Sequence, residues 1–259
     1  MVEEQSNDHG FTENLHEDGD FPKYTSDFHS MLRIIFWNSF GLFYLEFLIS
    51  YTAYADLDAT GLNIGSIVSV QILGYMISSF FAGSITDRYS KKKLVFFGSI
   101  GRGSAYYLIY ASLITENLTL LGFGTFSLGF GAGFFWIPLN SLIAEKSHKN
   151  NRSEAFGKRS QQMGLGTSVG ASIGFTFLIW CSDLGYSTYI IYLPILLYGV
   201  FNYYAGFKFL FSVDESNRIM DEQTIEKVEE SRNQQQFLTG MIFLFVVLFL
   251  ASTNGSIFR

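Results

Sequence analysis

Two ionisable residues, Glu46 and Arg102, lie inside long apolar stretches of the sequence. A charged side chain at membrane depth is energetically expensive unless it is paired or hydrated, so each should face protein or water. A carboxylate at position 46 could bind a cationic substrate, or take up and release a proton. Arg102 could recognise an anion. Each could equally tie its helix to a neighbour, and a direct pair between the two is a further hypothesis.

Uncharged polar side chains could line the same route. Asn38, Ser39 and Ser50 share a helical face with Glu46, which gives this stretch a polar stripe suited to a central cavity. The other candidates in apolar stretches are Gln71, Trp136 and Asn140. Amide and aromatic residues are as often helix-packing or interface residues as ligands. The candidate pathway for a substrate or a proton is therefore Glu46, Asn38, Gln71, Arg102, Trp136 and Asn140.

A charged motif follows the second apolar stretch. Its residues are Gly83, Asp87, Arg88, Lys91, Lys92 and Lys93, and a second charged group, Glu145 and Arg152, follows the fourth stretch. Gly83 would permit close helix approach, and Asp87 would cap a helix or pair with neighbouring charges. The basic residues would hold an ion-pair network. The alternative is that any stop-transfer segment ends in basic residues.

Enzymatic, metal and nucleic-acid chemistry have little support. The G-x-S-x-G match at 166–170 lies inside an apolar, glycine-patterned stretch, where Gly166, Gly170 and Gly174 instead indicate close helix packing. The single cysteine, Cys181, and four scattered histidines form no metal-binding pattern. The net charge of -6 reflects eight acidic residues in the first thirty positions. We therefore predict no enzymatic activity, no cofactor, no bound metal and no nucleic-acid partner.

The elements that must position these residues are membrane helices. Hydrophobic residues make up 48% of the 259 residues and charged residues only 15%. The apolar runs are long and nearly continuous, which favours helices over a transmembrane barrel. A window of about 20 residues, the length that a bilayer requires, predicts seven spans, at 31–51, 64–85, 94–114, 118–144, 163–181, 186–211 and 237–251.

The distribution of lysine and arginine predicts the orientation of these spans. Of 17 basic residues, all but Arg102 and Arg259 fall on one side, in alternate loops, at the adjoining span ends or before the first span. Because cytoplasmic loops retain positive charge, the N-terminus is predicted to be cytoplasmic, in the cell membrane. Residues 1–30 form an acidic, disordered tail, and 31–211 a six-helix domain. A charged cytoplasmic linker at 212–236 then precedes the seventh helix and chain end at 237–259.

The motif from Gly83 to Lys93 resembles the signature of the major facilitator superfamily between helices two and three, Gly-x-x-x-Asp-Arg-x-x-Arg/Lys-x-Arg/Lys. Glu145 and Arg152 resemble the family's charged loop between helices four and five, and Gly166, Gly170 and Gly174 its glycine-rich fifth helix. Two departures stand beside these matches. The arginine of the family's fourth helix is missing, with Thr125 near its place, and no proline follows the glycines of the fifth.

The resemblance implies an all-α integral membrane fold, with a six-helix N-terminal bundle of two inverted three-helix repeats. Asp87 and Arg88 would lock two halves in one state of alternating access. The third helix would be peripheral, which favours a structural role for Arg102. Relatives have twelve spans, so the chain looks truncated or paired with a separately encoded C-terminal half. The expected function is secondary transport of a small solute or ion through a lipid bilayer, and the alternative is a non-transporting scaffold or regulatory remnant.

Overall fold

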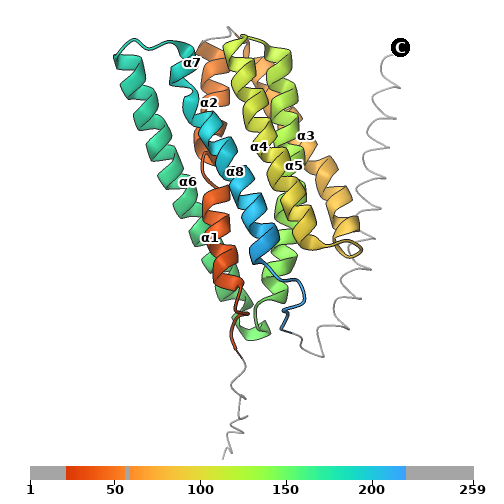
Figure 1. Cartoon of the computed structure of the whole chain (residues 1–259). Coiled ribbons are helices and arrows are strands. Elements are labelled where there is room, and N and C mark those ends of the chain that lie inside the picture. Colours follow the sequence, from red (N-terminus) through yellow and green to blue (C-terminus); the bar gives the residue numbers. More distant parts are fainter. Residues whose placement is uncertain (1–21, 56–58, 220–259) are drawn as a thin grey trace, which may run out of the picture.

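A computed structural model describes residues 22–55 and 59–219 of the chain. Long helices run back and forth between the two ends of an elongated bundle (Figure 1). The helices are α1 (Phe28–Asn38), α2 (Leu42–Ala55), α3 (Gly61–Thr86), α4 (Lys91–Ile114), α5 (Leu118–Glu145), the 3-10 helix η1 (Lys149–Asn151), α6 (Arg152–Asp183), α7 (Thr188–Ile191) and α8 (Leu193–Ser212). The predicted seventh span and residues 1–21 of the acidic tail lie outside the described residues.

The first predicted span is present as an apolar segment, Phe28–Ala55, but it consists of two helices and not of one. α1 ends at Asn38 and α2 begins at Leu42. Between them Gly41 adopts a φ of +79°, a left-handed conformation that a glycine reaches without steric cost. A Cβ on Gly41 would also lie 2.3 Å from the ring of Tyr198. The break lies against α8, near the middle of the bundle.

Glycines bring α5 close to α3 and α4. A Cβ on Gly129 would lie 2.0 Å from the carbonyl oxygen of Gln71, and one on Gly131 would lie 2.8 Å from the backbone nitrogen of Arg102. No side chain fits at either position without backbone movement. This close approach is how helices associate in lipid, where the hydrophobic effect does not drive them together.

The three glycines of α6 that were predicted to pack helices lie against the broken span. A Cβ on Gly166 would be 2.2 Å from the carbonyl oxygen of Phe36, and one on Gly170 would be 2.8 Å from the backbone nitrogen of Gly41. Gly174 faces the ring of Tyr44, 2.6 Å from the same hypothetical Cβ. α6 therefore follows both α1 and α2 across the break.

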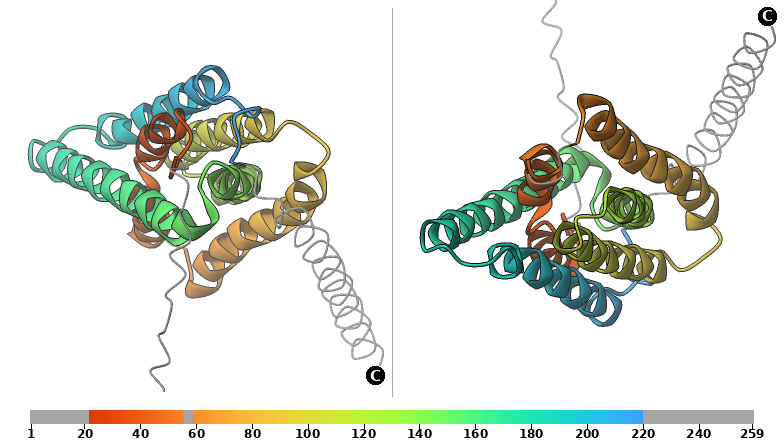
Figure 2. Two further views of the ribbon diagram at one scale, coloured as in Figure 1. Left: turned by 90° about the horizontal axis from the view of Figure 1, so that it is seen from below. Right: turned by 90° about the horizontal axis from the view of Figure 1, so that it is seen from above.

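Five helical segments of the described chain are long and apolar enough to cross a membrane. They are Phe28–Ala55, Gly61–Thr86, Leu118–Glu145, Lys149–Asp183 and Thr188–Ser212. α4 is not among them, and it carries Lys91, Lys92, Lys93 and Arg102. Seen end-on, α3 and α6 both lie on the outside of the bundle, on the side away from α8 (Figure 2). These two segments are also the least buried of the five, and they expose many large apolar side chains.

Candidate functional site

A cavity of about 400 Å³ opens among α2, α3, α4, α5 and α6. Its walls are mostly apolar, with a few polar and charged groups that converge from different helices. Such a composition is typical of small-molecule sites. The lining residues are Leu42, Glu46, Gln71, Ile72, Tyr75, Arg102, Tyr106, Leu128, Gly129, Ala132, Trp136, Asn140, Arg159 and Met163.

The cavity brings together most of the pathway residues predicted from the sequence. Five of the six line it, namely Glu46, Gln71, Arg102, Trp136 and Asn140. The sixth, Asn38, contacts Arg102 from behind the cavity wall. Polar residues scattered over more than 90 positions of sequence therefore face one cavity, and the helix packing described above places them there.

Arg102 is buried and contacts the C-terminal end of α1. Its side chain is 1% exposed. Nη1 donates a hydrogen bond to Oδ1 of Asn38, and Nη2 donates to the Asn38 carbonyl oxygen over 3.5 Å. Because Asn38 is the last residue of α1, the guanidinium lies at the negative end of that helix dipole, where a cation is stabilised. The break in the first span thus creates the site that holds Arg102.

The Asn38 side chain continues this network into α4 and α8. Its Nδ2 donates to Ser99 Oγ over 2.8 Å and to Asn202 Oδ1 over 3.2 Å. Ser99 Oγ in turn donates to the carbonyl oxygen of Asn202 over 2.8 Å. Sequence reasoning missed Ser99 and Asn202. The signal that could have found Asn202 is an amide within an otherwise apolar span, where an unbonded polar group is expensive.

Glu46 projects from α2 into the same cavity without a partner. In residues 22–55 and 59–219, no cation lies within 4 Å of its carboxylate and no hydrogen bond to that group is formed. The direct Glu46–Arg102 ion pair considered from the sequence is therefore not formed. The two charges share one cavity and remain separate, which leaves the carboxylate free to interact with something else.

Trp136 lies close to two arginines. The Arg102 guanidinium is 5.8 Å from the indole centroid and that of Arg159 is 4.6 Å away. Sequence analysis counted Arg159 as a loop cation, but α6 begins at Arg152, so Arg159 is two turns inside the helix. Two buried polar atoms here, Arg159 Nε and Asn140 Oδ1, have no hydrogen-bond partner within the described part of the chain.

The charged motif at the end of α3 forms fewer contacts than predicted. Asp87 and Arg88 are exposed and make no ion pair with described residues. Asp87 does not cap α4, because the N-cap is Ser90, whose hydroxyl accepts a hydrogen bond from the Lys93 amide. Nothing in the described chain lies within 4 Å of a Cβ placed on Gly83.

The ion pair that does form joins the two charged groups to each other. Lys91 at the start of α4 pairs with Glu145 at the end of α5. Arg218 approaches the second oxygen of the Glu145 carboxylate at 3.4 Å. Arg152 opens α6 and has a buried Nε that makes no hydrogen bond to any described residue. The amide of Lys92 donates to Glu215 over 2.6 Å.

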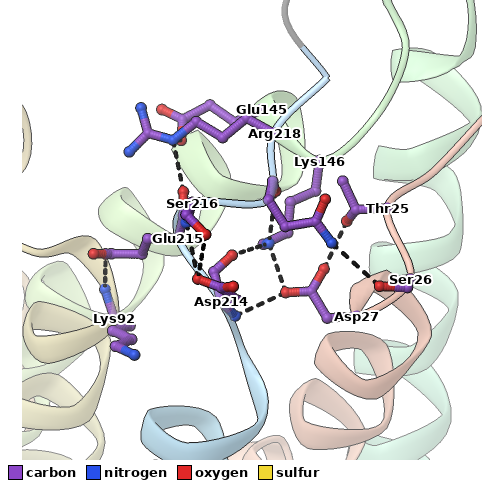
Figure 3. A network of polar contacts seen from close by, with 11 residues as sticks. Thr25, Ser26, Asp27, Lys92, Glu145, Lys146, Asp214, Glu215, Ser216 and Arg218 are labelled. Atoms are coloured by element: carbon purple, nitrogen blue, oxygen red, sulfur yellow. Dashed lines mark hydrogen bonds and ion pairs between the residues drawn. The ribbon is translucent and has the colours of Figure 1, made fainter.

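Lys146 organises a second network at the same end of the bundle (Figure 3). Its ammonium is fully buried and donates to Asp27 Oδ2 over 2.6 Å, and to the carbonyl oxygens of Asp214 over 2.6 Å and Asn217 over 3.1 Å. The Asp214 amide also donates to Asp27 Oδ2, over 2.9 Å. Three segments far apart in sequence are thus fastened together around one lysine.

No group of three or more histidine, cysteine, aspartate or glutamate side chains is close enough to hold a metal ion in the part of the chain described. The 166–170 segment lies within α6 and faces α1, so its serine does not occupy a strand-to-helix turn.

Comparison with known proteins places this geometry in context. The family model described as Major Facilitator Superfamily matches residues 31–258. A multi-drug resistance efflux pump PmrA homolog from Lactococcus lactis is 31% identical over 111 residues, which are 42% of this chain and 26% of the relative. The quinolone resistance protein NorA from Staphylococcus aureus is 28% identical over 119 residues, which are 46% of this chain and 30% of NorA.

A solved structure of a bacterial homologue of the human drug peptide transporters PepT1 and PepT2 is similar in fold. Its TM-score is 0.64 at 15% identity, and the alignment covers 83% of this chain and 50% of that protein. The chain therefore spans about half of that transporter, and its matches to the two curated relatives cover under a third of each.

Proposed function

Because the chain belongs to the Major Facilitator Superfamily, we propose that it moves a small solute across the cell membrane by alternating access. In this mechanism the cavity is the N-terminal half of the solute route. The Lys-rich end of the bundle, which contains Lys91, Lys92, Lys93 and Lys146, faces the cytoplasm together with the N-terminus. The observation that carries the proposal is the convergence of Glu46, Gln71, Arg102, Trp136 and Asn140 on one cavity.

Coupling to an ion gradient is assigned to Glu46. A carboxylate at membrane depth with no ion pair in the described chain is well placed to take up and release a proton as the cavity opens to either side. Arg102 is assigned a structural role, since its guanidinium is already bonded to Asn38. Glu46 is thus assigned to ion coupling, and Arg102 to holding the helices together.

A second half of the transporter would complete the cavity. α3 and α6 both contribute lining residues, and both present exposed apolar side chains on the flanks of the bundle. A facing bundle against these helices would cover that surface and close the solute route from the other side. Gly83, which is open in the described chain, lies on α3 where such a bundle could approach closely.

The test is the sidedness of labelling, because it requires no known substrate. In a Cys181→Ala chain, which removes the only cysteine, Ala132→Cys places a thiol in the cavity wall. A membrane-impermeant maleimide is then applied from the inside or the outside of cell-derived vesicles. The matched controls are the exposed residues Tyr89→Cys and Leu184→Cys, which lie at opposite ends of the bundle.

We expect Ala132→Cys to react from both sides, and each control to react from one side only. Reaction of Ala132→Cys from a single side, at every pH and temperature at which the controls behave as expected, would exclude alternating access. The non-transporting scaffold would then be the better description of the chain.

A further inference from the structure

More positive than negative side chains line the cavity. Two arginines, Arg102 and Arg159, line it against one carboxylate, Glu46. The cavity therefore carries an excess of positive charge within mostly apolar walls. In a medium of low polarity an uncompensated cation strongly favours an anionic partner.

Arg159 is the cation that remains available. Its Nε is buried without a hydrogen-bond partner, and no carboxylate lies within 4 Å of it, in the described residues. Its guanidinium stacks on Trp136, with 4.6 Å to the ring centroid. A stacked guanidinium keeps its N–H groups in its own plane, where they can meet a planar oxyanion. Arg102, by contrast, is already bonded to Asn38.

Asn140 lies at the same depth as Arg159. Arg159 is seven residues from the start of α6 and Asn140 five residues from the end of α5, or about 10 Å and about 8 Å along their helices. Both ends belong to the Lys-rich end of the bundle. The Asn140 amide has a buried, unbonded oxygen in the described chain, and half a turn about its last torsion would present its N–H groups instead.

We propose that the cavity binds an organic anion made of a carboxylate on a flat apolar body. The carboxylate lies between Arg159 and Asn140, and the apolar body lies along Trp136. This assignment rests on the proposed transport function and gives it a substrate class. Trp136 then has two roles, because it orients the guanidinium and supplies a face for the apolar body. Glu46 lines the same cavity and discriminates against a second anionic group by repulsion.

The test uses Trp136 fluorescence in the full chain. Trp37→Phe and Trp180→Phe leave Trp136 as the only one of three tryptophans. Quenching is titrated with 4-nitrobenzoate, neutral 4-nitrobenzamide and cationic 4-nitrobenzylamine. We expect the carboxylate to bind about tenfold more tightly than the amide, as a charge-assisted contact allows. Arg159→Gln should remove that preference, so that the carboxylate and the amide bind with equal affinity.

Two further variants keep the result interpretable. Arg159→Lys preserves the charge and should restore part of the preference, while Arg33→Gln changes an exposed arginine of α1 and should leave it intact. Equal affinity for the three probes, tighter binding of 4-nitrobenzylamine, or a preference that survives Arg159→Gln would each overturn the assignment.

Failure of this assignment and failure of the transport proposal are distinguishable. If Ala132→Cys is labelled from both sides but the carboxylate shows no preference, only the substrate class is wrong. If the carboxylate is preferred but labelling occurs from one side, the cavity is an anion site in a protein that does not transport by alternating access.

Discussion

At the scale of single residues, the cavity contains charges whose surroundings differ sharply. Arg102 has its hydrogen bonds supplied by Asn38 at the end of α1, whereas Glu46 has no partner in the described residues. A buried polar side chain whose hydrogen bonds are made within the fold contributes to stability. An ionisable side chain at membrane depth without such bonds indicates a functional role. The two residues should therefore respond differently to neutral substitution.

For Glu46→Gln we expect unchanged thermal stability and altered pH behaviour. The substitution removes no ion pair of the described chain, so the free energy of unfolding should stay within about 0.5 kcal/mol. The ratio of Ala132→Cys labelling from the two sides should vary with pH in the parent and not in the Glu46→Gln chain, because the ratio cancels the pH dependence of the thiol itself. Glu116→Gln, at an exposed position outside the spans, is the control. A large loss of stability in Glu46→Gln would show that its role is structural.

For Arg102→Ala we expect severe destabilisation. The substitution removes a fully buried side chain, leaves Oδ1 of Asn38 without its donor, and opens a space beside Phe135. The expected loss is about 2–5 kcal/mol, measured by thermal or denaturant unfolding in detergent. Arg33→Ala, on the exposed face of α1, should change stability by less than about 0.5 kcal/mol. Equal effects of the two substitutions would contradict this account.

Sequence reasoning identified the right kind of residue at this scale and missed those whose environment depends on packing. Glu46 and Arg102 stood out because ionisable groups are rare in apolar stretches. Arg159 and Lys146 were counted as loop cations, although one lines the cavity and the other is buried. A basic residue near a helix end has the same sequence signal whether it faces solvent or protein, so only the packing distinguishes the two.

At the scale of elements, glycine spacing is the strongest determinant of how the helices meet. α6 uses Gly166, Gly170 and Gly174 to approach the backbone of the first span, and α5 uses Gly129 and Gly131 against α3 and α4. Five of the seven predicted spans meet the criterion of apolar length in the described chain, and α4 does not. The break at Gly41 could not be predicted, because a lone glycine in an apolar run also fits a continuous helix.

Gly166→Ala and Gly164→Ala should have opposite effects. Alanine is the better helix former, by about 1 kcal/mol in an exposed helix. At Gly164 no described atom lies within 4 Å of the new methyl group, so we expect a small gain in stability. At Gly166 the methyl group would lie 2.2 Å from the Phe36 carbonyl oxygen, so α6 must move away from α1. Thermal unfolding measures both, and equal changes would refute the contact.

At the scale of the whole molecule, the polar network at the Lys-rich end connects segments that are far apart in the sequence. Lys146 binds Asp27 before α1 and the carbonyl groups of Asp214 and Asn217 after α8. The opposite end has no comparable cluster of ion pairs among the described residues. The charge asymmetry of the sequence predicted which end would be basic. It did not predict that ion pairs and hydrogen bonds at that end would hold the segments before α1 and after α8 to the end of α5.

For Asp27→Ala we expect a loss of stability that depends on pH. Burial alone would raise the pKa of Asp27, but hydrogen bonds from Lys146, Thr25 and the Asp214 amide outweigh it and lower the pKa from 3.8. The carboxylate therefore stabilises the fold fully above pH 3.8, and this contribution disappears as the pH falls through the lower pKa of the folded state.

The measurement is thermal unfolding in detergent between pH 7 and pH 2. Asp27→Ala should be less stable than the parent by about 1–3 kcal/mol near neutral pH, and the difference should narrow below pH 3.8. Asp183→Ala, at the exposed end of α6, is the control and should show no such difference. A gap that stays constant down to pH 2 would mean that the Asp27 charge is not what stabilises this end.

The segment after α8 is held against the bundle as far as Ile219. Val213 is buried, Asp214 and Asn217 bind Lys146, and the Ile219 amide donates to the Glu145 carbonyl oxygen over 2.9 Å. The chain is therefore anchored at Ile219, seven residues beyond the end of α8 at Ser212. Left free, those seven residues would reach about 23–25 Å in extended form. An anchor at Ile219 would shorten any tether that began there, and a shorter tether raises the effective concentration of what it carries beside the bundle.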